Sequence, residues 1–211
     1  MWDRSVINLT INYPQGSNSS FSSSKRPANA KPKTFANRGM SLEEDINQSN
    51  LYYLSKKIAV IHKKPTPVQI VKVHYPKRSA AVITEAYFKE ASTTDYNGIY
   101  RGHYLDFEAK ETKNKTSLPL TNFHDHQILH MKACLEQQGI VFILIRFSSL
   151  QETYLLPASI VIDYWDNQIK NKKKSIPHSV IQESGYEIQP GLFPRIPYLE
   201  IIDKYILKGD S

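Results

Sequence analysis

The run "IVFILIRF" at residues 140–147 most constrains what this chain can fold into, because seven of its eight residues are large and apolar. A strand with one solvated face alternates apolar and polar residues, whereas a continuous apolar run is typical of a strand covered on both faces. "ETYLLPA" at 152–158 predicts a neighbouring strand. Helices must then cover the sheet, and the order of expected helices and strands predicts an α/β fold with a mixed central sheet.

The expected helices lie on both sides of these strands in the sequence. Ser41 and Glu44 fit a capping box, which predicts a first helix at about 41–57. The side chains of this helix expected to face the core are those of Leu42, Ile46, Tyr53 and Leu54. We expect further helical segments at about 79–92, 121–138, 159–174, 176–184 and 194–206.

A basic segment follows the first helix. Residues 56–78 contain seven Lys or Arg and no Asp or Glu, in a chain whose net charge is +7. Pro65, Pro67 and Pro76 exclude a continuous helix, so we expect an extended and partly exposed ribbon. Lysines and prolines also protect sheet edges, but that role explains one or two lysines rather than seven, so the pattern favours an arm that faces DNA. A second basic run at 170–174 fits either a solvated helix end or a phosphate contact.

The first 38 residues differ in composition from the rest of the chain. After Tyr13 they are poor in large apolar side chains and rich in Ser, Asn, Lys and Pro, which predicts a disordered basic arm at 1–38 and a main domain at 39–208. No apolar run is long enough for a transmembrane helix, and the first residues do not resemble a secretory signal. The single cysteine, Cys134, cannot form an intramolecular disulfide, so we expect a cytoplasmic protein with a packed thiol and no membrane partner.

The strand pattern "YLDFEAKET" at 104–112 carries the candidate chemistry. Because side chains alternate along a strand, Asp106, Glu108 and Lys110 share one face, and a turn before this strand can bring Asp95 to Glu108. Two carboxylates can hold Mg²⁺ for phosphodiester hydrolysis, while a lysine can orient the attacking water or stabilise negative charge. A charge ladder exposed to water explains the same residues, and alternation alone leaves Asp95 and Asp106 as alternatives.

Polar residues on the expected helix at 121–138 add to this set. Gln127 can direct an amide oxygen toward the same metal or a bound water. His124, His126 and His130 suggest zinc, but the three do not share one helical face and the set of zinc ligands is incomplete. We therefore expect no zinc site on this helix.

Longer runs of the sequence resemble a known family. The chain closely resembles the RecU family of Holliday junction resolvases of Gram-positive bacteria in "NRGMSLEEDINQSNLYYL", "IAVIHKKPTPVQIVKV", "YPKRSAAVITEAYFKEASTTDYNGIY", "DFEAKETKNKTSLPL" and "NFHDHQILHMK". The resemblance extends from about residue 37 to about residue 205. It implies a restriction-endonuclease-like nuclease of the PD-(D/E)xK group, with a mixed central sheet flanked by helices and a projecting basic stalk at about 62–81. Thr94 stands where the name of that group has proline.

The resemblance also implies which residues form the site. Asp95, Glu108 and Lys110 would be catalytic, which favours Asp95 over Asp106, and Glu43 would either help to position them or only stabilise the first helical turn. The residues implied to hold Mg²⁺ are Thr93, Asp95, Glu108 and Gln127. The residues expected to contact DNA are Lys63, Lys64, Lys72, Lys77, Arg78, Lys113 and Lys115.

The implied activity is symmetric nicking of a four-way DNA junction in recombination and DNA repair. Members of the family are homodimers with two active sites, and they act alongside the branch-migration motor and the RecA recombinase. The alternative is a non-catalytic junction-binding or architectural protein, or a regulator of recombination. The complete set of two acids, a lysine and Gln127 favours the endonuclease, because a protein that only binds DNA does not need it.

Overall fold

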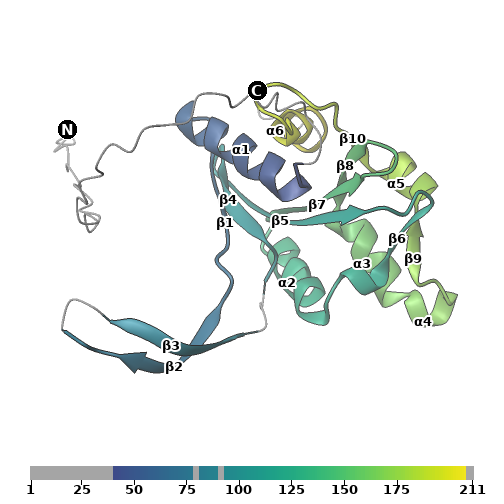
Figure 1. The fold of residues 1–211 in the computed structure, drawn as a ribbon. Coiled ribbons are helices and arrows are strands. Elements are labelled where there is room, and N and C mark those ends of the chain that lie inside the picture. The colour runs from purple at the N-terminus through teal and green to yellow at the C-terminus, as the bar shows by residue number, and fades with distance from the viewer. Residues whose placement is uncertain (1–39, 78–80, 90–92, 208–211) are drawn as a thin grey trace, which may run out of the picture. The chain divides into compact units, whose positions relative to one another are not determined.

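The computed structural model describes residues 40–77, 81–89 and 93–207, so the expected arm at 1–38 lies outside the described residues. A central six-stranded sheet has the spatial order β1 (Val60–Lys63), β4 (Tyr96–Tyr100), β5 (His103–Thr112), β7 (Ile140–Phe147), β8 (Glu152–Pro157) and β10 (Tyr186–Glu187) (Figure 1). Strands β5 and β7 are parallel and the other pairs are antiparallel. The predicted mixed central sheet is therefore confirmed.

Strand β7 is the central strand that the apolar run predicts. All of its residues are buried except Arg146, and its side chains alternate between two cores. Phe142 and Leu144 join the core on one face of the sheet, while Ile143 and Ile145 join the core on the other. Because both faces are covered, neither can carry the polar half of an alternating pattern.

Helices cover each face of the sheet, as Figure 1 shows. The first face is covered by α1 (Leu42–Ser55), α6 (Tyr198–Ile201) and a π-helical turn (Ile202–Ile206). The second face is covered by a 3-10 turn (Leu120–Asn122), α2 (Asp125–Glu136), α3 (Ala158–Asp166) and α5 (His178–Ser184), with α4 (Gln168–Asn171) and the small sheet of β6 (Ser117–Pro119) and β9 (Ser175–Pro177) beside them. Within the described ranges no helix has the length and apolar character needed to span a membrane.

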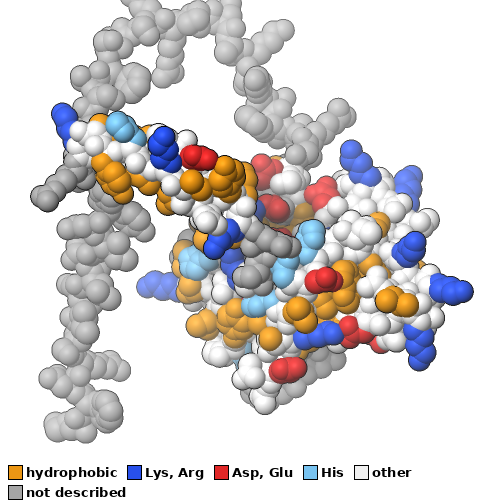
Figure 2. Space-filling view, turned by 90° about the horizontal axis from the view of Figure 1, so that it is seen from below, with side chains coloured by type: hydrophobic (Ala, Val, Ile, Leu, Met, Phe, Trp, Pro, Cys, Tyr) orange, Lys and Arg blue, Asp and Glu red, His pale blue; other side chains and the backbone are white. Residues whose placement is uncertain are grey.

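A separate two-stranded sheet follows β1. Strands β2 (Val68–His74) and β3 (Val82–Phe88) pair only with each other, and every residue of theirs is exposed except the half-buried Val73. We call this pair the β2–β3 hairpin. Residues 64–67, with Pro65 and Pro67, connect it to β1, and the N–H of Lys89 donates to the carbonyl of Pro67 at 2.9 Å. Figure 2 shows hydrophobic side chains along the visible face of this hairpin, beside lysines and histidine.

The β2–β3 hairpin corrects one expectation. Residues 79–92 were expected to be helical, but 82–88 form β3, which pairs from Val82 opposite His74 to Phe88 opposite Val68. Ala, Glu and Lys in this segment favour a helix. Its β-branched residues favour a strand, and pairing with β2 supplies the hydrogen bonds of that strand. The hairpin also continues past the expected end of the stalk near residue 81.

The helix boundaries also differ in part from the expectations. The capping box of Ser41 and Glu44 is confirmed, but Leu54 is 43% exposed and does not face the core. The second expected helix begins only at Asp125, and the third is divided at Asn167. His124, which precedes α2, has an extended backbone, and Asn167 lies outside the α-helical region; an apolar pattern does not show such local departures.

The dipeptide "NG" at residues 97–98, often a turn signal, lies inside β4, and the turn expected before β5 falls at Arg101–Gly102. Gly98 has a different reason to be glycine. A Cβ atom there would lie 2.2 Å from the carbonyl oxygen of Val60, so the close approach of β1 excludes any side chain.

Candidate active site

Glu108 lies at the centre of a buried polar cluster on the face of β5 that α2 covers. Its carboxylate is 1% exposed, and its Oε1 atom accepts hydrogen bonds from Nζ of Lys110 at 2.6 Å and Nε2 of Gln127 at 2.7 Å. The backbone N–H of Asp95 donates to the second oxygen, Oε2, at 3.0 Å. An exposed charge ladder is therefore the wrong description of this face.

The pairing of β4 with β5 places Asp95 beside Glu108. Tyr96 lies opposite Phe107, so the residue before Tyr96 reaches the residue after Phe107. Oδ2 of Asp95 accepts a long hydrogen bond from the N–H of Ala109, at 3.4 Å. The structure thus brings Asp95, Glu108 and Lys110 together, although Asp95 is 13 residues away from Glu108 in the sequence.

The two acids of this cluster lie close enough for their charges to repel each other. Burial raises the pKa of Glu108 to about 7, the ammonium of Lys110 opposes that rise, and the charge of Asp95 adds to it. A cation bound between the two carboxylates would relieve their repulsion. Oxygen ligands of this kind suit a hard cation such as Mg²⁺, so the residues fit the ion that the family implies.

Gln127 belongs to the cluster through its amide nitrogen. Its Oε1 atom accepts a hydrogen bond from the backbone N–H of His124 at 3.2 Å, which closes the N-terminus of α2. Presenting that oxygen to a cation would require the amide to turn over and release His124. Thr93 is half-buried, and its hydroxyl donates to the carbonyl of Thr94 at 3.3 Å.

Asp106 is buried in a second cluster and does not bond to Glu108. Its Oδ2 atom accepts from Nζ of Lys64 and the hydroxyl of Tyr104, each at 2.9 Å, and lies 3.1 Å from Nε2 of His130. The hydroxyl of Thr94 donates to Oδ1. With both oxygens occupied, Asp106 is a poorer candidate than Asp95 for a ligand beside Glu108.

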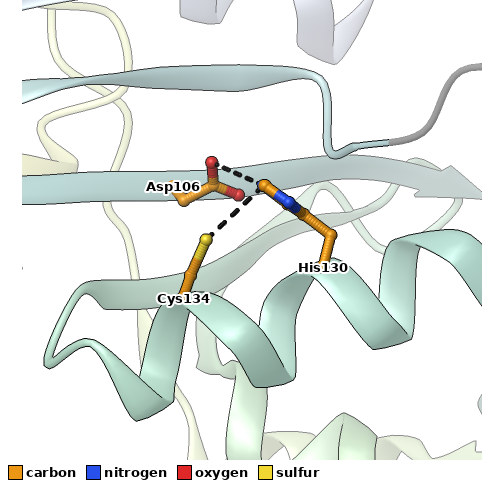
Figure 3. Close-up of side chains that lie close together, drawn as sticks. All are labelled: Asp106, His130 and Cys134. Carbon is orange, nitrogen blue, oxygen red and sulfur yellow. Dashed lines mark hydrogen bonds and ion pairs between the residues drawn. The ribbon is translucent and has the colours of Figure 1, made fainter.

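The three histidines do not converge. His124 and His126 stack on each other with ring centroids 5.4 Å apart, whereas His130 faces Asp106. Cys134, half-buried one turn further along α2, places its sulfur 3.5 Å from Nε2 of His130, so this neighbourhood holds Asp106, His130 and Cys134 (Figure 3).

The residues expected to contact DNA fall into four groups. Lys72, Lys77, Lys113 and Lys115 are exposed, the first two on or next to the β2–β3 hairpin and the others after β5. Lys63 forms an ion pair with Glu43, so both side chains are engaged with each other. Lys64 turns inward to Asp106, and Arg78 lies outside the described residues.

Sequence reasoning missed the residues that surround Asp106. Thr94 lies before β4 and His130 lies on α2, so no spacing in the sequence relates these two residues to Asp106. Two signals were available: Tyr104 lies two residues before Asp106 on the same face of β5, and an acid between Leu105 and Phe107 lies deep in the sheet and needs partners.

The sequence is similar to known proteins over most of its length. The chain is 59% identical over 208 residues to the Holliday junction resolvase RecU of Lactiplantibacillus plantarum, covering 96% of this chain and 99% of the relative. It is 60% identical over 181 residues to the Holliday junction resolvase RecU of Streptococcus mutans, covering 86% and 91%. These relatives belong to a class of nucleases. The family model described as Recombination protein U matches residues 37–204, and the chain belongs to the RecU family.

Among solved structures, the chain is similar to Archaeoglobus fulgidus Hjc, a Holliday junction resolvase from an archaeal hyperthermophile. The TM-score is 0.38 at 13% identity, and the match covers 69% of this chain and 92% of the other. The family assignment rests on the sequence matches.

Proposed function

We propose that this protein is a structure-selective endonuclease that resolves Holliday junctions by Mg²⁺-dependent, symmetric nicking. The observation that carries the proposal is the convergence of Asp95, Glu108 and Lys110 in one buried cluster, in a chain whose relatives are named as junction resolvases. A protein that only binds DNA has no need for a buried Glu108 with a second acid and a lysine beside it.

The proposed roles combine the geometry of the cluster with the set of metal ligands that the family resemblance implies. Asp95 and Glu108 would hold Mg²⁺ together with Gln127 and Thr93. The bound ion would supply a water of lowered pKa and neutralise charge that develops on the phosphate. Lys110 is held between Oε1 of Glu108 and the ring of Phe123, whose centroid lies 5.3 Å from Nζ. From this position its ammonium would orient the attacking water and donate to the phosphate oxygen that becomes more negative.

Hydrolysis forms one bond between the water oxygen and phosphorus and breaks one ester P–O bond. The carboxylates of Asp95 and Glu108 therefore have to stay in place while the geometry at phosphorus changes. Both carboxylates are held by backbone N–H groups, of Ala109 and Asp95 respectively, which supports such a fixed arrangement.

Junction recognition would come from the β2–β3 hairpin and the exposed lysines near it. Phosphate neutralisation by Lys72 and Lys77 gives affinity without base readout, and selection of a four-way junction would then depend on DNA shape. A homodimer would place one active site on each of two equivalent strands, which matches the approximate two-fold symmetry of a junction. The cytoplasmic location remains an expectation from the single cysteine, and the branch-migration motor and the RecA recombinase remain expectations from the family resemblance.

The test is incubation of the full chain with a synthetic four-way junction and with linear duplex, in Mg²⁺ and in EDTA. We expect paired symmetric nicks in the junction only, and only with Mg²⁺. Wild-type protein that binds the junction but leaves it intact in Mg²⁺ would instead support the non-catalytic alternative.

Two variants test the site assignment. Asp95→Asn and Lys110→Ala should each slow nicking by about 10²–10³-fold or more, because the first removes a proposed Mg²⁺ ligand and the second a proposed donor to the phosphate, and junction binding should remain. Asp125→Asn, an exposed acid at the start of α2, is the matched control and should cut normally. Nicking at the wild-type rate by either site variant would show that the assignment is wrong.

A further inference from the structure

Lys64 lies where the chain leaves the central sheet for the β2–β3 hairpin. Its backbone N–H donates to the carbonyl of Asp95 at 2.7 Å, which continues the pairing of β1 with β4. Asp95 is close to the point where the chain returns from the hairpin. Lys64, which precedes the β2–β3 hairpin, is therefore hydrogen-bonded to Asp95, a proposed catalytic residue that follows the hairpin.

The side chain of Lys64 points inward rather than toward solvent. Nζ donates to Oδ2 of Asp106 at 2.9 Å and to the hydroxyl of Thr94 at 3.0 Å, and the side chain is only 18% exposed. Asp106 is fully buried, and a buried carboxylate needs a cation and hydrogen bonds to remain charged. A lysine that supplies that charge is not available to a DNA phosphate.

The same contact would compete with a metal ion for the neighbouring side chains. The ligand atoms of Asp106, His130 and Cys134 all lie within 4.8 Å of one another, a spacing that could suit a metal ion (Figure 3). However, Nζ of Lys64 lies 2.9 Å from Oδ2 of Asp106 and 3.5 Å from Nε2 of His130. The positive charge beside Asp106 in this structure is therefore the ammonium of Lys64.

Lys64 holds the segment that carries Asp95 at two points. It bonds the carbonyl of Asp95 directly, and through Asp106 it holds Thr94, whose hydroxyl donates to the same carboxylate. On its other side, the N–H of Asp95 is bonded to Glu108. The position of the Asp95 carboxylate relative to Glu108 thus depends on contacts made by Lys64.

We propose that Lys64 is a positioning residue: through Asp106 and Thr94 it holds Asp95 beside Glu108 and ties the base of the β2–β3 hairpin to the cleavage site. The role rests on the proposed function. It replaces the expectation that Lys64 contacts DNA, and it means that a shift of the hairpin on a bound junction is transmitted to the proposed metal ligand Asp95.

The test compares Lys64→Met with Lys72→Met in the full-length protein. Methionine keeps an unbranched side chain and removes the charge, and Lys72 is an exposed hairpin lysine that serves as the matched control. Two quantities are measured: the single-turnover nicking rate of a junction at saturating protein in Mg²⁺, and the slope of log affinity against log salt in EDTA.

Opposite results are expected for the two lysines. Lys64→Met should slow nicking of bound junction by about 10²-fold, the usual scale of a misplacement near 1 Å, and leave the salt slope unchanged. Lys72→Met should reduce the slope by about one phosphate contact, whereas Lys132→Met, which removes a lysine paired with Asp166, should keep both the wild-type slope and the wild-type nicking rate. Lys64→Met should also raise the Mg²⁺ concentration needed for half-maximal rate, because Asp95 is displaced.

A second variant separates positioning from folding. Lys64→Met leaves the buried carboxylate of Asp106 without its cation, so the single variant is expected to be less stable. Lys64→Met combined with Asp106→Asn removes both charges, and we expect its thermal stability to recover while its nicking rate remains low. Recovery of both stability and nicking would overturn the proposal, since the lysine would then only stabilise the fold.

Two other results would also decide the matter. Lys64→Met that cuts bound junction at the wild-type rate and has a reduced salt slope would make Lys64 a phosphate contact. Wild-type protein that nicks no junction in the same assay would overturn the proposed function, and this role with it.

Discussion

The β2–β3 hairpin and the β5–β7 pair are built from similar residues but are stabilised in different ways. Strand β7 is buried along its length between two cores, whereas every residue of β3 is exposed. Both contain Val or Ile together with Phe, which favour strands. The difference shows that these residue types determine the extended backbone, while the covering helices determine whether the strand is buried.

The comparison also shows which part of the molecule needs a partner. An isolated two-stranded hairpin is only marginally stable in water, and this one exposes large apolar side chains. The exposed set includes Val68, Ile70, Val71, Val82, Ile83, Tyr87 and Phe88. We therefore expect the hairpin to contribute to binding and the β5–β7 pair to contribute to stability and catalysis.

The largest effect should come from two matched truncations. Phe142 is fully buried on β7, so Phe142→Ala should lower the free energy of unfolding by about 3–5 kcal/mol. Phe88 is 83% exposed on β3, so Phe88→Ala should change it by less than about 0.5 kcal/mol. Urea denaturation of both variants measures the difference. Equal losses would mean that the hairpin shares the stability of the central sheet, and the comparison would fail.

A smaller effect is expected from the charge of the hairpin. Replacing Lys72 and Lys77 together with methionine should reduce the slope of log junction affinity against log salt by about 0.9 for each lysine. The measurement is a binding titration at several salt concentrations in EDTA. Lys132 of α2, paired with Asp166 of α3, provides the control, and Lys132→Met should keep the wild-type slope. An unchanged slope in the double variant would remove the hairpin from the DNA interface.

The smallest effect should be a pH dependence of stability that arises from Glu108 on β5. The pKa of Glu108 is raised from 4.5 to about 7, so between these values the folded protein keeps a proton that the unfolded chain has released. Stability of metal-free wild type relative to Glu108→Gln should therefore fall as pH rises from about 4.5 to about 7, and then level off. Thermal unfolding in EDTA across this range measures it. A difference in melting temperature that stays constant with pH would contradict the raised pKa.

The two regions also differ in how well the sequence predicts them. Strand β7 was predictable because burial on both faces removes polar residues, and that removal is visible in "IVFILIRF". Strand β3 was not, because "ITEAYFK" contains both strand and helix formers and its backbone is decided by pairing with β2, which is a non-local interaction.

The candidate site shows the same limit. Alternation along β5 correctly placed Glu108 and Lys110 on one face, but it placed Asp106 there too. Asp106 is separated from the Glu108 cluster by its bonds to Lys64, Tyr104 and His130, and two of these come from other elements of the fold. Local periodicity can give the face of an acid, whereas its partners depend on tertiary packing.

The short connection between β1 and the β2–β3 hairpin limits how far the hairpin can move to fit a DNA junction. Residues 64–67 contain Pro65 and Pro67, and each proline restricts its own backbone and that of the residue before it. Most of the conformational entropy of this connection is therefore already lost when the protein folds, before any DNA is bound. If the hairpin contacts the arms of a junction as proposed, a stiff connection of this kind would make binding depend on the angle between the arms, because a junction with the wrong angle could be bound only by bending the protein.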